Sequence, residues 1–411
     1  MKSKDFHGIF FKYCAKMDNF ACFKTIMILC TCWILLAIIS IALTGKFINE
    51  VLPIDRYIGS VSTNSKEIIL GLNSTGTERT DVLAVAYMRT GSTFLGKVLG
   101  WRNDVFFWFE PLRKYGAWQY LRQNDLLCHI LRPNCEILSE NSIRHPKKAQ
   151  RFLLDMFDCH LQPYDNMPTD INFNPKLLPP SWTEYAKCKK SMNASFTCNK
   201  LLVNSCKTAK HRIAKVLRTD LEGTIPLLKN NPRLKIVHLL RDPRAIMNSH
   251  LRTWWVRKEL KTYTQIEADS IVICSRMRSD ILAGKSLMKL YPDRVRLLQY
   301  EDFNNLDENV QKLYKFLNME FTSQQDNILR SLKKDSPRDK PTSKKNVTYI
   351  AYDGFHPFDF RQKMGWNISA IVQKYCGDVL RDLGLRQFKT EAEYLNLSQN
   401  VVIDKLPFQL T

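Results

Sequence analysis

Residues 89–94 bring together the side chains and backbone that hold anions. Arg89-Thr90-Gly91-Ser92-Thr93 follows an apolar run at 81–88 and precedes Phe94, where apolar residues continue at helical spacing. At such a strand-to-helix turn, the first N–H groups of the helix point outward, glycine permits close approach, and arginine and hydroxyls add donors. The pattern predicts a site for a phosphate or a sulfate, although an ordinary strand-to-helix turn has the same outline.

A second arginine stands in the same kind of position. Arg241 ends the apolar run 235–240 and is followed by Asp242 and Pro243, a helix N-cap and a first helical residue. Ser249 falls two turns into that predicted helix, where its hydroxyl can join Arg241 on one phosphate group. Two anion sites on one sheet predict a ligand with two separated phosphates, unless Asp242 only caps the helix and the arginines are solvated.

Strands and helices must alternate to position these residues. A further strand at 295–300 and a helix at 307–317 continue the order seen around the two motifs. Such alternation predicts an α/β fold with a mainly parallel central sheet flanked by helices. We place this domain at residues 80–390, after a polar stem at 45–79 and before a C-terminal tail at 391–411, and we interpret 163–199 as a long loop or insertion stapled by disulfides.

The two motifs together resemble a known family. AYMRTGSTFLGKVL with VFFWFEPL, and VHLLRDPRAIMNS, are similar to the Golgi carbohydrate sulfotransferases of the galactose/N-acetylglucosamine/N-acetylgalactosamine 6-O group. The likeness covers most of residues 80–386. It implies a P-loop-like sulfotransferase fold, 3′-phosphoadenosine 5′-phosphosulfate as donor without a metal, and a glycan or proteoglycan as acceptor. It assigns residues 89–94 to the 5′-phosphosulfate and Arg241 and Ser249 to the 3′-phosphate.

Sulfuryl transfer needs positioning, cationic stabilisation and a base. Arg89 and the loop amides would steady the transferring group and the departing 5′-phosphate. Glu110, in Phe109-Glu110-Pro111, is the predicted base that takes the proton of the sugar hydroxyl, with a capping or surface glutamate as the alternative. His238 lies within a predicted strand and is expected to be a packed histidine.

Residues 25–44 predict a membrane anchor. This segment, TIMILCTCWILLAIISIALT, contains no charge and has the length of a membrane-spanning helix. A cleaved signal peptide is the alternative, but its apolar core is usually shorter, and no obvious small-residue cleavage site follows Leu43. Five lysines against two aspartates in the tail at 1–24 predict a cytosolic N-terminus. The domain would then face the lumen, and the resemblance places it in the Golgi. Five glycosylation sequons agree with this topology, beginning at Asn73, Asn193, Asn346, Asn367 and Asn396.

The cysteines and the net charge indicate which compartment and which kinds of ligand to expect. Eight of the twelve cysteines follow the span, so disulfides are expected in an oxidising compartment, with open connectivity. Among those eight there is no CxxC pair, which disfavours a zinc site. The net charge of +21 predicts attraction to polyanions. We expect an acidic acceptor or the phosphorylated donor and no nucleic acid, and we leave a homodimer open.

Two other functions compete with a sulfotransferase. A lumenal nucleotide-dependent kinase would need a phosphate loop of the form G-x-x-x-x-G-K-[ST], whose nearest match at 71–77 lacks the lysine. A catalytically silent glycan-binding protein would keep the basic groove without turnover. The acceptor sugar and polymer are not specified by these motifs.

Overall fold

A computed structural model describes residues 79–161, 179–191, 195–333 and 357–410 of the 411-residue chain. The described residues belong to one compact unit that begins near Thr77. The predicted tail, span and most of the stem lie outside them, as do the sequons at Asn73, Asn193 and Asn346. Within the described part of the chain, no helix is both long and apolar enough to cross a membrane.

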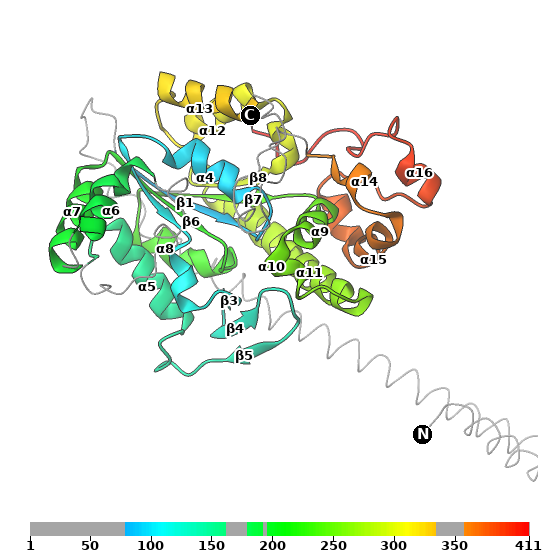
Figure 1. Ribbon diagram of the computed structural model, residues 1–411, viewed down its shortest axis with the longest axis horizontal. Coiled ribbons are helices and arrows are strands. Elements are labelled where there is room, and N and C mark those ends of the chain that lie inside the picture. Colours follow the sequence, from blue (N-terminus) through cyan, green and yellow to red (C-terminus); the bar gives the residue numbers. More distant parts are fainter. Residues whose placement is uncertain (1–78, 162–178, 192–194, 334–356, 411) are drawn as a thin grey trace, which may run out of the picture. The chain divides into compact units, whose positions relative to one another are not determined.

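A five-stranded parallel sheet forms the centre of the unit (Figure 1). Its strands run in the order β2-β6-β1-β7-β8, which places β1 in the middle, and they are Val105–Phe109, His211–Val216, Thr80–Ala86, Leu234–Leu240 and Val295–Gln299. Every pairing in this sheet is parallel. The prediction of a mainly parallel sheet is therefore confirmed, and all strand carboxyl ends meet at one edge.

Helices cover both faces of the sheet. Helix α4 (Ser92–Gly100) packs on β1, β2 and β6, while α11 (Tyr263–Leu290) packs along β8 and α8 (Ile225–Asn230) contacts β7. In Figure 1 α4 lies above the strands with α12 and α13, and α5, α8 and α11 lie below them. The bounds of the helices not yet given are α5 Pro146–Phe157, α6 Thr183–Ser191, α7 Ser195–Thr208, α9 Pro243–Arg252, α10 Trp254–Arg257, α12 Leu306–Phe316, α13 Ser323–Lys333, α14 Phe360–Lys363, α15 Trp366–Asp382 and α16 Glu391–Leu395.

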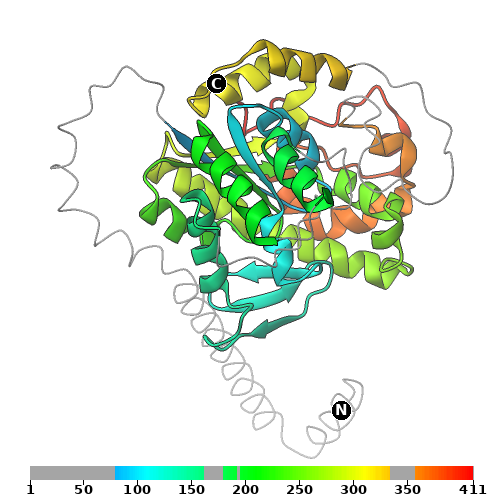
Figure 2. The ribbon, with the colours of Figure 1, turned by 60° about the vertical axis from the view of Figure 1, so that its left-hand side comes forward.

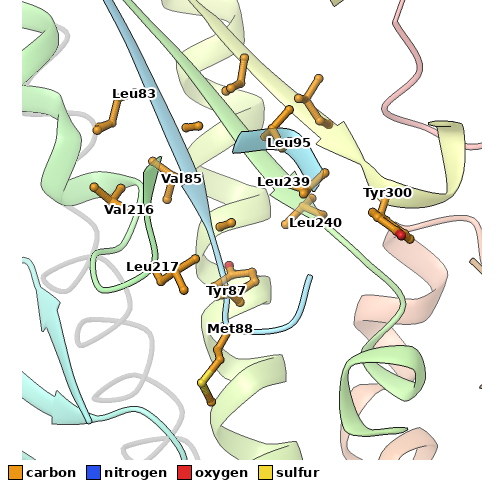
Figure 3. Close-up of a cluster of buried hydrophobic side chains, with 14 of the residues drawn as sticks. Leu83, Val85, Tyr87, Met88, Leu95, Val216, Leu217, Leu239, Leu240 and Tyr300 are labelled. Atoms are coloured by element: carbon orange, nitrogen blue, oxygen red, sulfur yellow. The ribbon is translucent and has the colours of Figure 1, made fainter. Parts of the chain in front are cut away.

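The core continues to the carboxyl edge of the sheet. Figure 3 shows side chains of β1, β6 and β7 packed together up to Tyr87, Met88 and Leu240. The strands are buried on both sides, so their sequences read as continuous apolar runs without alternation. The buried strands therefore form a firm support at the carboxyl edge of the sheet for the loops that follow them.

A small antiparallel sheet lies apart from the central one. It has the order β3-β4-β5, from Gln119–Arg122, Leu126–His129 and Cys135–Ile137. In Figure 2 this sheet stands below the central sheet, between the helices and the lower edge of the domain. This sheet was not predicted, because its short strands lack a sustained apolar pattern in the sequence.

Disulfides join the described parts of the chain in four places. The pairs are Cys128–Cys135, Cys159–Cys206, Cys188–Cys198 and Cys274–Cys376. All eight cysteines that follow the predicted span are thus used, which confirms the expectation of disulfides. The Cys274–Cys376 bond closes the longest stretch of chain and ties α11 to α15.

The middle segment differs from its prediction as a loop. Residues 183–191 form α6 and residues 195–199 begin α7, and the Cys188–Cys198 disulfide joins the two helices. Trp182, fully buried against Phe106 and Trp108 of β2, donates from Nε1 to the carbonyl of Phe107. This anchor holds α6 on the domain, and only tertiary contact creates it.

Residues 391–410, treated above as a C-terminal tail, pack on the domain. Tyr394, Val401 and Phe408 are buried, and Leu385 forms a β-bridge with Val402. Arg361 fixes this segment because its guanidinium donates to the carbonyls of Tyr394, Gln399 and Asn396. The compact unit therefore continues past residue 390.

Candidate active site

The loop after β1 has a backbone shaped for close approach. Arg89 and Gly91 both have left-handed backbone conformations, with φ of 68° and 95°. No side chain caps α4, whose N-cap is Gly91. The first N–H groups of a helix have no partner inside it, so the loop presents donors and the positive end of the helix dipole together. This geometry suits an anion.

The other predicted loop residues divide into two groups. The Thr90 hydroxyl donates to the carbonyl of Tyr87 at 2.9 Å and is buried, so this hydroxyl shapes the loop from inside. Phe94 is also buried, edge-on to Phe303 at 5.4 Å, and only its backbone remains for an anion. Ser92 and Thr93 begin α4.

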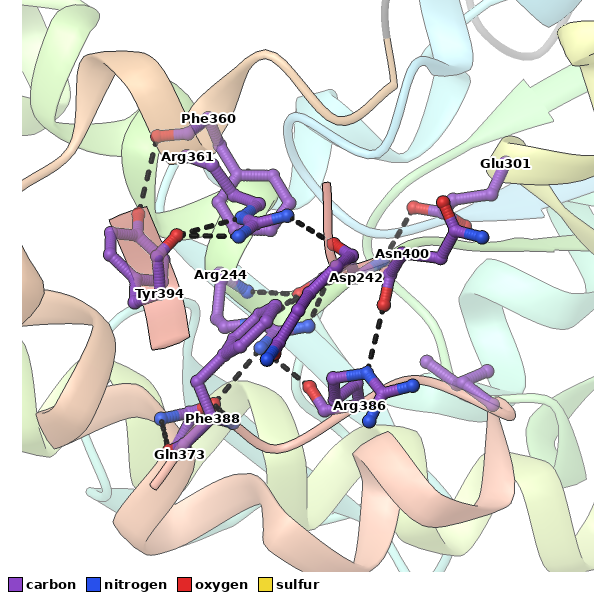
Figure 4. A network of polar contacts seen from close by, with 12 residues as sticks. Asp242, Arg244, Glu301, Phe360, Arg361, Gln373, Arg386, Phe388, Tyr394 and Asn400 are labelled. Atoms are coloured by element: carbon purple, nitrogen blue, oxygen red, sulfur yellow. Dashed lines mark hydrogen bonds and ion pairs between the residues drawn. The ribbon is translucent and has the colours of Figure 1, made fainter. Parts of the chain in front are cut away.

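The second predicted motif forms as expected. Asp242 caps α9 by accepting from the backbone N of Arg244 at 2.8 Å, which confirms the predicted helix start. Arg244 is fully buried and pairs with Asp242, while its Nη1 donates to Gln373 and to the carbonyl of Arg386 (Figure 4). Arg244 is thus a structural residue that ties α9 to the C-terminal segment, not a solvated one.

Tertiary structure brings the two motifs into direct contact. The Nε of Arg89 donates to the Ser249 hydroxyl at 2.9 Å, and Nη1 of Arg241 donates to the Arg89 carbonyl at 3.1 Å. Strands β1 and β7 are neighbours in the sheet, with Ala86 opposite Leu239, which explains why Arg89 and Arg241 meet although 152 residues separate them. Two arginines and a hydroxyl therefore converge at one edge.

Tyr300 supports both arginine-bearing segments from the end of β8. The Arg241 guanidinium lies over its ring, 4.3 Å from the centroid. A methyl group added at Gly91 would collide with the same ring. Only glycine fits between this ring and the loop, and its positive φ is a second reason for glycine at this position.

Glu110 lies at the end of β2 and is held by two cations. Its Oε1 accepts from Lys215 Nζ and its Oε2 from Arg218 Nη1, both at 2.8 Å. Burial alone would raise its pKa, but the charges of Lys215 and Arg218 outweigh burial and lower the pKa to about 2. The side chain is 10% exposed, and each of its two oxygens is engaged by one cation.

His238 is packed in the core, as predicted. It is fully buried beside Tyr87, and burial lowers its pKa to about 3. A neutral histidine inside the sheet cannot contact a sugar hydroxyl. Among the described residues, no three His, Cys, Asp or Glu side chains gather as metal ligands would.

Sequence reasoning missed Lys215, Arg218 and Tyr300. Lys215 and Arg218 lie at the carboxyl end of β6, which with β2 is one of the two central strands that the sequence patterns did not predict. A signal was present, because residues 213–217 are apolar apart from Lys215 and are followed by Arg218, which repeats the position of Arg89 and Arg241 after a strand. Tyr300 had no such signal, since its position over Gly91 follows from sheet order alone.

Comparison with known proteins agrees with this geometry. The sulfotransferase domain model matches residues 79–384. Carbohydrate sulfotransferase 1 of Danio rerio is 24% identical over 82% of this chain and 85% of its own length. Carbohydrate sulfotransferase 5 of Mus musculus is 27% identical over 80% and 86%, and carbohydrate sulfotransferase 6 of Homo sapiens is 26% identical over 80% and 87%.

The family model spans the central sheet, both arginine-bearing loops and the Glu110 ion pairs. The named relatives align over more than four fifths of their own length. The chain therefore belongs to the sulfotransferase domain family, and the relatives that it resembles within that family are carbohydrate sulfotransferases.

Proposed function

We propose that this chain transfers a sulfuryl group from 3′-phosphoadenosine 5′-phosphosulfate to a hydroxyl of a glycan, at the 6-position of galactose, N-acetylgalactosamine or N-acetylglucosamine. The observation that carries the proposal is the cluster of Arg89, Arg241 and Ser249 at adjacent strand ends. A donor with two separated phosphates needs two neighbouring anion sites, and this edge offers both. The named relatives support a sugar as acceptor.

The loop after β1 would hold the 5′-phosphosulfate. Arg89 and the first N–H groups of α4 would stabilise the charge that spreads over the peripheral oxygens during transfer. Arg241 and Ser249 would hold the 3′-phosphate, and Arg241 already lies against the Arg89 backbone. When bound, the donor supplies an activated sulfuryl group on a phosphate that leaves as an anion.

Glu110 is our proposal for the base. In the reaction the sulfur–oxygen bond to the donor phosphate would break, a new bond from sulfur to the sugar oxygen would form, and the hydroxyl proton would pass to the Glu110 carboxylate. A hydroxyl becomes far more acidic as its oxygen bonds to sulfur, so an ionised carboxylate of low pKa suffices late in the transfer. Lys215 and Arg218 would hold this carboxylate in place.

The same proposal places the domain in the Golgi lumen behind a single-pass type II anchor at 25–44. The described sequons support it, because Asn367 and Asn396 are exposed on the surface of the domain. Four disulfides suit an oxidising compartment. Protease added to sealed vesicles should trim only the short N-terminal tail, and digestion of the domain in intact vesicles would refute the topology.

Sulfate transfer from ³⁵S-labelled donor to a panel of glycans tests the activity. We expect label on at least one sugar acceptor and release of 3′,5′-adenosine bisphosphate in equal amount. A glycan-binding protein without catalysis would bind acceptors and transfer no label. A kinase would transfer phosphate from labelled ATP to the same panel and ignore the sulfate donor.

A further inference from the structure

Four exposed cations and an exposed indole lie close together between the end of α9 and the residues that follow α10. We define the α10 corner as Trp254 with its basic neighbours Arg252, Arg257, Lys258 and Lys261. Trp254 is 50% exposed, and Lys258 Nζ lies 4.6 Å from the centroid of its ring. The single acid in residues 252–261, Glu259, pairs instead with Arg132. Among the described residues, no carboxylate forms an ion pair with any of the four cations.

The corner is fixed beside the anion loop. Thr253, the N-cap of α10, donates from its hydroxyl to the carbonyl of Ser249 at 2.7 Å, and Ser249 itself accepts from Arg89. His250 adds a second tie, since its Nε2 lies 3.4 Å from the Met88 carbonyl and its Nδ1 lies 2.6 Å from Asp269. The corner therefore begins one helical turn from a residue that we assign to the donor site.

A row of aromatic rings joins the corner to the Glu110 side of the site. Trp255 packs edge-on against Trp118 at 5.4 Å, and Trp118 stacks on His129 with the planes 7° apart. The carbonyl before Trp118, that of Ala117, accepts from Arg218, which also pairs with Glu110. Donor loop, corner and proposed base are thus connected through these packed rings and through hydrogen bonds to the Ser249 and Ala117 carbonyls.

We propose that the α10 corner is an acceptor subsite for an acidic saccharide, one that carries carboxylate or sulfate groups on sugars next to the reacting one. An exposed indole among cations that lack ion-pair partners does not stabilise the fold. The same residues would bind a ligand that has an apolar ring face and anionic substituents. The C–H face of a sugar fits the negative face of the Trp254 ring. Arg257 and Lys258 offer charge-assisted hydrogen bonds to carboxylates or sulfates. The inference rests on the proposed function, because it places this ligand as the acceptor.

Direct binding tests the subsite without turnover. The purified full-length chain with 3′,5′-adenosine bisphosphate is titrated with an oligosaccharide of alternating uronic acid and hexosamine, and with a neutral oligosaccharide of equal length. The double variant Arg257→Gln/Lys258→Gln should bind the acidic probe about tenfold more weakly and lose part of its salt dependence. Trp254→Ala should weaken both probes. The charge-matched control Lys389→Gln/Lys405→Gln, which removes two exposed cations of the C-terminal segment, should change neither.

Several outcomes would overturn the subsite. One is equal affinity of the Arg257/Lys258 variant and the wild type for the acidic probe, and another is equal weakening in the Lys389/Lys405 control. A third is loss of binding to phosphatidylserine vesicles in the Arg257/Lys258 variant while saccharide binding is kept, which would assign the corner to a membrane surface.

Transfer assays separate this inference from the proposed function. The subsite predicts that the Arg257/Lys258 variant raises KM for an acidic acceptor about tenfold with little change in kcat, and leaves the affinity for 3′,5′-adenosine bisphosphate intact. Unchanged KM values in an active enzyme would overturn the subsite and leave the function standing. Corner-dependent binding of the acidic probe without transfer to any glycan would refute the function and keep the corner as a saccharide site.

Discussion

Arg89 and Ser249, 160 residues apart, share a hydrogen bond of 2.9 Å between Nε and the hydroxyl. Each belongs to a different predicted anion site, so this bond joins the 5′ and the 3′ halves of the proposed donor site. Arg241 adds a second link through the Arg89 carbonyl. A substitution in one half of the donor site should therefore also alter ligand binding in the other half.

Arg89→Ala should lower sulfate transfer by about a hundredfold or more while the domain still folds. The side chain is half-buried and its loop lies at the edge of the core, so its removal opens no core cavity. Turnover and thermal stability measured on the same preparation check this. Wild-type turnover in the variant would contradict the assignment of this loop to the 5′-phosphosulfate.

Arg241→Ala should weaken binding of 3′,5′-adenosine bisphosphate about tenfold or more, and Ser249→Ala by a smaller factor. Both variants remove groups assigned to the 3′-phosphate, so their effects should vanish with adenosine 5′-phosphate as ligand. Calorimetric titration of the two nucleotides measures the difference. If both variants still discriminate between the nucleotides by the wild-type factor, the 3′ site lies elsewhere.

Tyr300→Leu should weaken the same bisphosphate about tenfold, although Tyr300 is not assigned to the ligand. Its ring supports Arg241 at 4.3 Å and fills the space over Gly91, and leucine provides no aromatic face for the guanidinium. The control Tyr300→Phe keeps the ring and should stay close to wild type. Equal loss in both variants would show that the hydroxyl matters instead of the ring.

Glu110→Gln should reduce turnover by about a hundredfold and keep nucleotide binding, because glutamine cannot take the proton. It should also destabilise the fold by about 3 kcal/mol, since Lys215 is buried and loses its counter-charge.

The double variant Glu110→Gln/Lys215→Met separates these two effects. Removing the buried cation should restore much of the thermal stability and none of the turnover if Glu110 is the base. Recovery of turnover together with stability would identify Glu110 as an anchor for its cations, and the proton acceptor would have to be sought elsewhere.

Glu301→Gln should remove part of the pH dependence of stability. Burial and the neighbouring Asp242 raise the pKa of Glu301 to about 7, and its Oε1 accepts from the Asp242 backbone N at 2.9 Å. A carboxyl with a raised pKa binds its proton more tightly when folded, so its ionisation costs stability as the pH rises from about 4.5 through 7.

The expected cost of Glu301 ionisation is at most about 3 kcal/mol. The wild type should therefore lose thermal stability between pH 5 and pH 7.5 more steeply than Glu301→Gln does. Parallel melting curves across this range would contradict the assignment of Glu301. Glu110, whose pKa is lowered, acts in the opposite direction and stabilises the fold above its ordinary pKa.

Local chemistry in the sequence determined the two anion motifs, the Asp242 cap and the parallel strands that carry them. These features depend on residues within one strand, one turn and one helix, so their pattern is readable along the chain. The structure confirms the Asp242 cap and the parallel strands, and it pairs all eight cysteines that follow the predicted span, while the two anion sites stay a prediction.

Only the tertiary structure decided which of these parts meet. Sheet order puts β6 between β1 and β2, which brings Lys215 and Arg218 to Glu110 from more than 100 residues away. The same order sets Tyr300 over Gly91, and Arg361 binds the segment that the sequence analysis treated as a tail. Contacts of this kind depend on strand order and register, which no local pattern of residue types encodes.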